Sequence, residues 1–223
     1  ETSYLVTGNT VERRVRTDTA YDNFGNPTEV TVTTTGGNRS FTTTTTNTYT
    51  NNTTDWILGR LTRAEVTQSR FNDTGTRVSA FEYRTDGLLS KEIIEPDAPD
   101  NSPLKLTTSY GYDAFGNQTR ATVTGWNGTA LESRATTTIY DPQGRFPIRT
   151  TNALGHRETY QYDSRFGTPV ALTGPNNLTT TWAYDGFGRK VLETRADGTR
   201  TRWDYAWCGA ACPNGGYGVT RRD

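Results

Sequence analysis

The segment Tyr184-Asp185-Gly186-Phe187-Gly188-Arg189 decides the fold, because its pattern returns along the chain. The shared pattern is Tyr-Asp-x-x-Gly followed by Asn or Arg, and one copy carries an extra residue before its Gly. A fixed period is typical of a repeat architecture, so it has to be explained before any single element. The four other copies are Tyr21–Asn26, Tyr112–Asn117, Tyr140–Arg145 and Tyr162–Gly167, the last being the longer one.

Each Tyr-Asp-x-x-Gly motif predicts the tip of a β-hairpin. Asp at position i of a type I turn accepts hydrogen bonds from the backbone two residues on. Gly at i+3 adopts the positive φ with which the chain re-enters the ladder as a bulge. We therefore expect structural turn positions at Tyr21, Asp22, Gly25, Tyr112, Asp113, Gly116, Tyr140, Asp141, Gly144, Tyr162, Asp163, Gly167, Tyr184, Asp185 and Gly188.

The residues on either side of each tip predict strands. Thr180, Trp182 and Tyr184 fall on one strand face, and the other repeats place Tyr or Trp in the same way, which predicts an aromatic ladder. Arg189–Arg195 reads as the return strand, and Ala196–Thr199 as a second turn. One repeat is then two strands of roughly seven residues joined by two turns.

The spacing of the tyrosines gives the organisation of the chain. Tyrosines 112, 140, 162, 184 and 205 are 28, 22, 22 and 21 residues apart. We expect a single array over 1–223, less regular over 1–109, regular over 110–205, with a cysteine-containing tail at 206–223. The predicted fold class is all-β with almost no helix. Antiparallel hairpins in series should form a curled or spiralling sheet, since open sheets of more than about ten strands curl or split.

The composition favours a folded β protein over a disordered chain. Leu, Ile, Val and Phe number only 36 of 223 residues, which is typical of disorder, but 24 basic residues balance 24 acidic ones and 25 residues are aromatic. The 45 threonines and the aromatics suit a half-buried pleated surface. Zero net charge disfavours nucleic acid or an anionic membrane as a partner, and no apolar run is long enough to span a membrane. The first residues, Glu1–Tyr4, are neither an initiator Met nor a signal peptide, so we expect a processed product or an excerpt.

The Tyr-Asp turns, together with Trp56-Ile57-Leu58-Gly59-Arg60-Leu61-Thr62, resemble the RHS/YD-repeat family over about Tyr21–Tyr205. Members include bacterial Rhs polymorphic toxins, the B and C components of insecticidal toxin complexes, and animal teneurins. The Trp56 segment and Trp207–Pro213 are bacterial in style. In this family YD repeats build a spiralling β-sheet shell around a hollow; toxin members enclose a toxic domain, and teneurins use the shell as an adhesive scaffold.

The resemblance implies a non-catalytic structural element of a secreted or surface protein, part of a shell that encloses a toxin or cargo. The chain is too short to close such a shell alone, so the implied partners are further YD repeats of the same polypeptide or copies of itself. An alternative is a self-assembling, fibre-forming or adhesive extracellular protein whose edge strands pair head to tail. An enzyme is not expected.

Asp141-Pro142-Gln143-Gly144 is similar to the Asp-Pro-x-Gly element that Rhs toxins carry before the toxin. Here it occupies the hairpin tip of a repeat that more repeats follow. We expect a plain turn, with Pro at i+1 where type I turns favour it. Fragmentation that is lost in Asp141→Asn would indicate cleavage instead.

The candidates for other chemistry are few. His156 is the only histidine and no Gly-x-Ser-x-Gly is present, so we expect a turn-flanking polar residue rather than a catalytic base. One His and two Cys do not readily make a zinc site, so no metal or cofactor is expected. Cys208 and Cys212 leave two alternatives: a disulfide that closes a small loop, or two reduced thiols.

The aromatic and charged residues also allow two interpretations. Trp126, Trp182 and Trp203 are either sugar-stacking platforms or, as we favour, core residues of the sheet's concave face. The repeated aspartates suggest glycosidase carboxylates, but side chains that return at every repeat are turn caps before they are catalysts. The 21 arginines alternate with acids, which predicts cross-strand ion pairs rather than a nucleic-acid surface.

Overall fold

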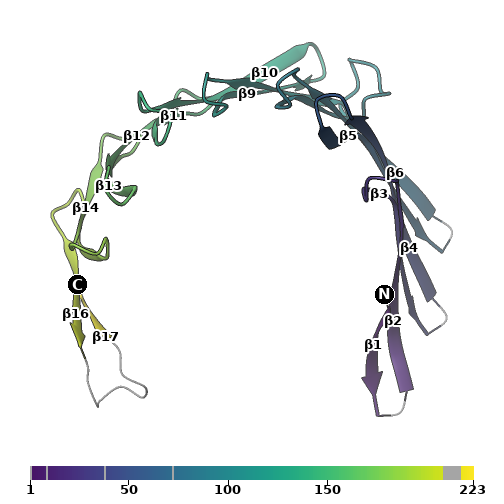
Figure 1. The fold of residues 1–223 in the computed structure, drawn as a ribbon, viewed down its shortest axis with the longest axis horizontal. Coiled ribbons are helices and arrows are strands. Elements are labelled where there is room, and N and C mark those ends of the chain that lie inside the picture. The colour runs from purple at the N-terminus through teal and green to yellow at the C-terminus, as the bar shows by residue number, and fades with distance from the viewer. Residues whose placement is uncertain (1, 9, 38, 72, 208–216) are drawn as a thin grey trace. The chain divides into compact units, whose positions relative to one another are not determined.

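The computed structural model describes residues 2–8, 10–37, 39–71, 73–207 and 217–223. The chain divides into two compact units. Unit 1 comprises Glu1–Gly111 and Ala121–Arg134, and unit 2 comprises Tyr112–Arg120 and Ala135–Asp223. The regular secondary structure of the described residues consists of β-strands alone. These strands follow one another as hairpins (Figure 1).

Unit 1 is built from long strands. They are β1 (Thr2–Thr7), β2 (Thr10–Tyr21), β3 (Pro27–Gly36), β4 (Arg39–Asn52), β5 (Ile57–Arg70), β6 (Asp73–Tyr83), β7 (Leu89–Ile94) and most of β8 (Leu106–Tyr112). Each pairs antiparallel with the next along the chain. Residues of β9 (Gln118–Trp126) and β10 (Leu131–Tyr140) contribute to both units.

Unit 2 has shorter strands and follows the repeat closely. They are β11 (Pro147–Thr151), β12 (Arg157–Asp163), β13 (Thr168–Thr173), β14 (Thr179–Tyr184), β15 (Lys190–Thr194), β16 (Arg200–Trp207) and β17 (Tyr217–Arg222). Each pairs antiparallel with its neighbour in sequence. The expected all-β fold of antiparallel hairpins in series is therefore confirmed.

The irregularities of the expected period lie in unit 1. Its β4 and β5 have 14 residues each, whereas β11–β15 of unit 2 have five to seven. The additional residues are taken up as strand extensions at the ends of β1, β3 and β5, which reach Thr7, Gly36 and Arg70. The insertions thus lengthen the hairpins and leave their order unchanged.

A register shift comes directly before the repeat Tyr in five hairpins. It lies between Ala20 and Tyr21, Glu82 and Tyr83, Ile139 and Tyr140, Gln161 and Tyr162, and Ala183 and Tyr184. Such a bulge places two residues of one strand opposite one of its partner and increases the local twist. The bulge is therefore part of the repeat, together with the turn that follows it.

The sheet has little core. Among the described residues no apolar side chain is buried, and Thr201 is the one buried residue. The chain exposes 14997 Å² to solvent, whereas a compact monomer of this mass exposes roughly 10,000 Å². Ladder hydrogen bonds and contacts along the faces of the strands therefore carry much of the stability. The described residues include no helix that is long and apolar enough to cross a membrane.

Candidate functional site

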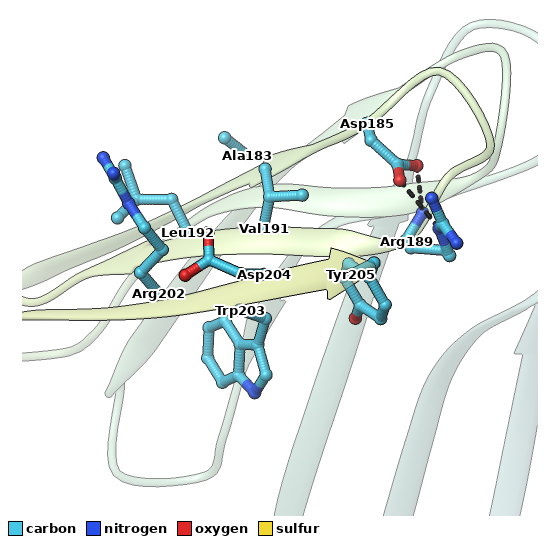
Figure 2. Close-up of a pocket in the computed structure, with 9 residues that line it drawn as sticks. All are labelled: Ala183, Asp185, Arg189, Val191, Leu192, Arg202, Trp203, Asp204 and Tyr205. Atoms are coloured by element: carbon cyan, nitrogen blue, oxygen red, sulfur yellow. Dashed lines mark hydrogen bonds and ion pairs between the residues drawn. The ribbon is translucent and has the colours of Figure 1, made fainter. Parts of the chain in front are cut away.

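The Tyr-Asp turn at Asp185, between β14 and β15, illustrates the geometry of the repeat. Asp185 Oδ1 accepts hydrogen bonds from the backbone N–H of Phe187 at 2.9 Å and of Arg189 at 3.0 Å. Its Oδ2 accepts one from Arg189 Nε at 2.7 Å, as Figure 2 shows. Gly188 N donates to the Asp185 carbonyl at 3.0 Å, which closes the turn. One carboxylate thus satisfies two backbone donors and a guanidinium within five residues.

The turns at Asp22 and Asp113 have the same geometry with an amide in place of the guanidinium. Asp22 accepts from Asn26 Nδ2 at 2.8 Å, and Asp113 accepts from Asn117 Nδ2 at 3.1 Å. The Asn117 amide also donates to the Gly144 carbonyl at 2.7 Å, so it joins its own turn to the next repeat. Asn and Arg are interchangeable at this position because each supplies a side-chain donor to the Asp.

The remaining two turns vary the pattern. Asp141 accepts from the backbone N–H of Arg145, four residues on as in the turns above, and from that of Phe146, five residues on. Asp163 accepts from the backbone N–H of Arg165 and from its guanidinium at 3.1 and 2.7 Å, and Gly167 N closes a longer turn onto the Asp163 carbonyl at 2.8 Å. The extra residue before Gly167 lengthens the loop and leaves the Asp in place.

These hydrogen bonds lower the pKa of the turn carboxyl groups. The Arg165 guanidinium and backbone N–H lower the pKa of Asp163 to about 2. The Asn26 side chain, opposed by partial burial, lowers the pKa of Asp22. For Asp113, Asp141 and Asp185 burial raises the pKa, but hydrogen bonds from the following backbone N–H groups outweigh it, and the pKa is lowered. All five carboxyls are held ionised, which suits a turn cap and disfavours a general acid.

In three of the five turns the glycine also contacts a Phe of the preceding repeat, whereas a Cβ built at Gly25 meets no atom within 4 Å. A Cβ added at Gly188 would lie 3.0 Å from the Phe166 ring, and one at Gly167 would lie 3.2 Å from Phe146. At Gly144 the ring of Phe115 lies closer still. These glycines have φ of +76°, +68° and +68°. Glycine therefore serves both a left-handed backbone and a close contact between repeats.

The repeat tyrosines join neighbouring strands through their hydroxyl groups. Tyr184 donates to the Pro169 carbonyl at 2.7 Å, and Tyr205 donates to the Lys190 carbonyl at 3.0 Å. In unit 1, Tyr83 donates to the Leu61 carbonyl at 2.9 Å. Burial raises the pKa of Tyr83 and Tyr184, since a phenolate would lose hydration there. Each ring thus spans from its own strand to the one before it.

The predicted aromatic ladder takes a mixed form. Phe146 and Tyr162 stack with ring centroids 4.9 Å apart. Elsewhere a cation lies over the ring: Arg189 lies 4.5 Å from the Tyr205 centroid and Lys190 lies 4.3 Å from that of Trp203. Cations and aromatic rings attract at these distances because the ring face carries negative charge. The repeat arginines therefore hold a turn Asp and an aromatic ring at once.

Ion pairs run both across and along strands. Lys91 and Glu82 pair across β6 and β7 at 2.9 Å, as expected. Arg16 and Asp18, two residues apart on β2, pair at 2.8 Å. Residues i and i+2 share a strand face, so an alternating sequence allows both arrangements.

Arg60 departs from the repeat pattern. It follows Gly59 as Arg189 follows Gly188, but Gly59 N donates to the Asn51 side-chain oxygen at 2.7 Å, whereas Gly188 N donates to the backbone carbonyl of Asp185. The Arg60 guanidinium lies over the Tyr83 ring at 5.6 Å. Its Nε and Nη2 are buried and have no hydrogen-bond partner among the described residues. Arg60 therefore keeps the contact between a repeat arginine and a tyrosine ring, but it has no turn Asp to pair with.

A hollow of about 430 Å³ lies beside the Asp185 turn, over β14–β16. Ala183, Val191 and Leu192 give it an apolar floor, and it is open to solvent. Figure 2 shows Trp203 and Tyr205 on the opposite side of the strands from Ala183 and Val191. The two carboxylates beside the hollow are paired, Asp185 with Arg189 and Asp204 with Arg222 at 3.4 Å. The hollow therefore offers no unpaired carboxylate for acid–base chemistry.

The three tryptophans are partly exposed. Trp182 Nε1 donates to Glu193 Oε2 at 3.0 Å, and the Lys190 ammonium occupies one face of Trp203. Trp126 is half-buried at the end of β9. None of the three is buried as a core residue would be. Sugar stacking on them remains a prediction, with one face of Trp203 already covered.

The other candidates lie in turns. Asp141–Gly144 forms a hairpin tip that Gly144 N closes onto the Asp141 carbonyl at 2.9 Å. His156 N donates to Asn152 Oδ1 at 3.0 Å in the turn before β12. The described residues hold no group of three or more His, Cys, Asp or Glu side chains placed to bind a metal. Cys208 and Cys212 lie outside the described residues.

The contact between a Phe and the next Gly was missed in the sequence. A partial signal was present, because Phe115 and Phe166 directly precede the Gly of a repeat turn, whereas Phe146 precedes a Pro. The motif alone does not say which neighbour each Phe meets, since that depends on the register between strands.

Comparisons with known proteins agree with this geometry. Residues 164–201 match the family model described as RHS Repeat. No curated protein matches the chain. Two solved structures are similar at 14% sequence identity and a TM-score of 0.51: the Tc holotoxin pore of Photorhabdus luminescens with a substitution in TccC3, and TcdB2-TccC3 without its hypervariable C-terminal region.

The first similarity covers 88% of this chain and 13% of that chain, and the second covers 87% and 12%. The chain thus spans about an eighth of the length of either structure, and at this identity the likeness shows the fold alone. The matched segment contains the Asp185 turn, with β13, β14 and β15 around it. The chain carries an RHS repeat, and its resemblance to the RHS/YD-repeat family is confirmed.

Proposed function

We propose that the chain is a wall element of a larger secreted or surface-associated Rhs-like shell that encloses a toxin or another cargo. The observation that carries this proposal is the combination of a repeated, hydrogen-bonded hairpin with the lack of any buried apolar side chain among the described residues. Such a sheet is held together along its length and leaves its faces free for neighbours. The role is mechanical, and its partners are further repeats of the same polypeptide and the enclosed cargo.

Two further observations support this function. The similar structures are toxin-complex components, and this chain matches a small part of their length, as a wall segment would. The repeat carboxyls accept hydrogen bonds from their own turns and are ionised, and the two carboxylates beside the hollow over β14–β16 are paired. The hydrogen bonds of each repeated turn are thus made within the repeat itself.

The test uses the complete product of the gene that contains this sequence, digested with proteinase K under native conditions. We expect a segment outside the repeats to stay intact, and the same segment expressed alone to be degraded. Cell fractionation should find the product outside the cytoplasm. Equal cleavage of the joined and isolated segments would overturn enclosure, and fibres in electron micrographs would favour self-assembly instead.

A further inference from the structure

The tip of the β5–β6 hairpin presents an aromatic side chain on a backbone that usually needs glycine. Phe71 has φ of +45° and is 89% exposed. The hairpins β1–β2 and β3–β4 have Gly8 and Gly37 at the same first position of the turn, with φ of +63° and +57°. A bulky side chain in this region is a steric outlier. Gly would therefore be more favourable than Phe for the backbone conformation at position 71.

Phe71 borders a hollow of about 360 Å³ that it shares with Arg39, Ser40, Phe41 and Arg70. Phe41 and Arg70 are directly opposite each other on β4 and β5, and the Arg70 guanidinium lies 4.9 Å from the Phe41 ring centroid. Phe41 is 44% exposed. The hollow thus has two accessible aromatic rings with cations beside them, in a volume at the lower end of ordinary ligand sites.

The charged residues that line this hollow, Arg39 and Arg70, are both cationic. No acidic residue lines it. Among the described residues neither Arg39 nor Arg70 forms an ion pair, although Asp73 faces Arg70 across the hairpin. A guanidinium stacked on a ring keeps its edge free for bidentate binding of a carboxylate. The hollow is therefore complementary to an anion that carries an apolar group.

We propose that this tip is a docking site for an acidic segment of a partner protein, in which one large apolar side chain is flanked by carboxylates. The apolar side chain would lie against Phe41 and Phe71, and the carboxylates would bind Arg39 and Arg70. Aromatic residues and Arg are the side chains that dominate such contacts. A lipid surface fits less well, because binding to anionic membranes uses clusters of about four to eight Lys or Arg, and the hollow has two.

The probe is a fluorescein-labelled peptide, Ser-Gly-Asp-Phe-Asp-Gly-Ser, titrated with the protein and followed by fluorescence polarisation. We expect saturable binding that weakens as salt is raised, and at least tenfold weaker binding of the peptides with Asn-Phe-Asn or Asp-Ala-Asp at the centre. Phe71→Gly and Arg70→Gln should each lower the affinity for the first peptide at least tenfold. Equal binding of all three peptides, or no binding at millimolar protein, would overturn the proposal.

A matched control is Trp56→Gly. Trp56 also has positive φ, +55°, and is 73% exposed, but it lies at the other end of β5. This variant should bind the peptide as the wild type does. Phe71→Gly should unfold at the same denaturant concentration as the wild type or a higher one, so its loss of binding cannot come from unfolding. Sedimentation with phosphatidylserine vesicles that depends on Phe71, without peptide binding, would reassign the site to lipid.

Discussion

Gly188 shows at the scale of one residue why the repeat keeps its glycine. Its φ of +76° is unfavourable for any side chain, and the Phe166 ring occupies the place of a Cβ. Gly186, two residues earlier in the same turn, has no atom within 4 Å of a built Cβ and no positive φ. The two glycines of one turn therefore have different roles.

Substitution by Ala separates these roles. Gly188→Ala should destabilise the fold by about 1–2 kcal/mol from backbone strain alone, and by more if Phe166 has to move. Gly186→Ala should stabilise it by about 0.4–1 kcal/mol, because Ala restricts the unfolded chain. The measurement is the free energy of unfolding from denaturant titrations. Equal effects of the two substitutions would contradict the assigned contact.

The lowered pKa of Asp163 makes the folding stability of the chain depend on pH. The pKa of Asp163 is about 2 in the folded chain, against an ordinary value of 3.8. A lowered folded pKa contributes stability that is present above the ordinary value and is lost as the pH falls toward the folded one. Asp163→Asn should therefore lower the unfolding midpoint at neutral pH, and its difference from the wild type should narrow between about pH 4 and pH 2. A difference that does not change with pH would exclude this role of the carboxylate.

The contacts that could be predicted from the sequence are those between residues close together in the chain. The Asp185 carboxylate and the backbone donors of Phe187 and Arg189 lie within five residues, so the motif itself specifies their geometry. The seat of Phe166 on Gly188 and the bond from Tyr184 to the Pro169 carbonyl join residues 15 to 22 positions apart. They depend on strand register, which a pattern in one sequence does not fix.

At the scale of the element, the hairpins of unit 2 were predictable and the lengths of those in unit 1 were not. Thr42–Thr46 is an unbroken run of threonine within β4. Such a run lacks the apolar–polar alternation that marks a strand and its ends, so nothing in it shows where a strand stops. Gly36 and Gly37 form a turn signal at the end of β3, but the strand extensions on either side carry no signal of their length.

One repeat should be removable as a unit. Deleting Asp163–Tyr184, about 22 residues, joins Tyr162 to Asp185 and restores a complete Tyr-Asp turn while removing β13 and β14. Because each repeat contacts mainly its neighbours, the shortened chain should keep its β-type circular dichroism and unfold cooperatively.

A deletion that is shorter by one residue is the control. Removing Asp163–Ala183 leaves an extra Tyr between the strand and its turn, which moves the side chains to the opposite face. This variant should lose cooperative unfolding or aggregate. If both deletions behave alike, the register of the repeat does not determine the fold.

At the scale of the whole molecule, the low aliphatic content acquires a physical reason. A chain that leaves 14997 Å² exposed has no interior that would require Leu and Ile in large numbers. Thr and the aromatics are used because they cover a pleated surface that stays half open to water. The composition predicted the class of fold, but not that burial would be limited to Thr201 among the described residues.

The heat capacity of unfolding should record this exposure. Compact proteins give about 12–15 cal/mol/K per residue, in proportion to the area that unfolding exposes. The area that this chain buries is about a fifth smaller than that of a compact chain of its mass. We therefore expect about 10–12 cal/mol/K per residue by differential scanning calorimetry. A value at or above the range of compact proteins would mean that the free chain buries more surface than the described sheet does.

In three repeats a Phe contacts a Gly that comes later in the chain, and this order has a consequence for folding during synthesis. Phe115 meets Gly144, Phe146 meets Gly167 and Phe166 meets Gly188, so the glycine always comes from the repeat that is synthesised afterwards. Such a hairpin, when it has just left the ribosome, therefore exposes its Phe until about 21 to 29 more residues have emerged. Folding on the ribosome would then advance one repeat at a time, with the newest hairpin always the least protected from chaperones and proteases.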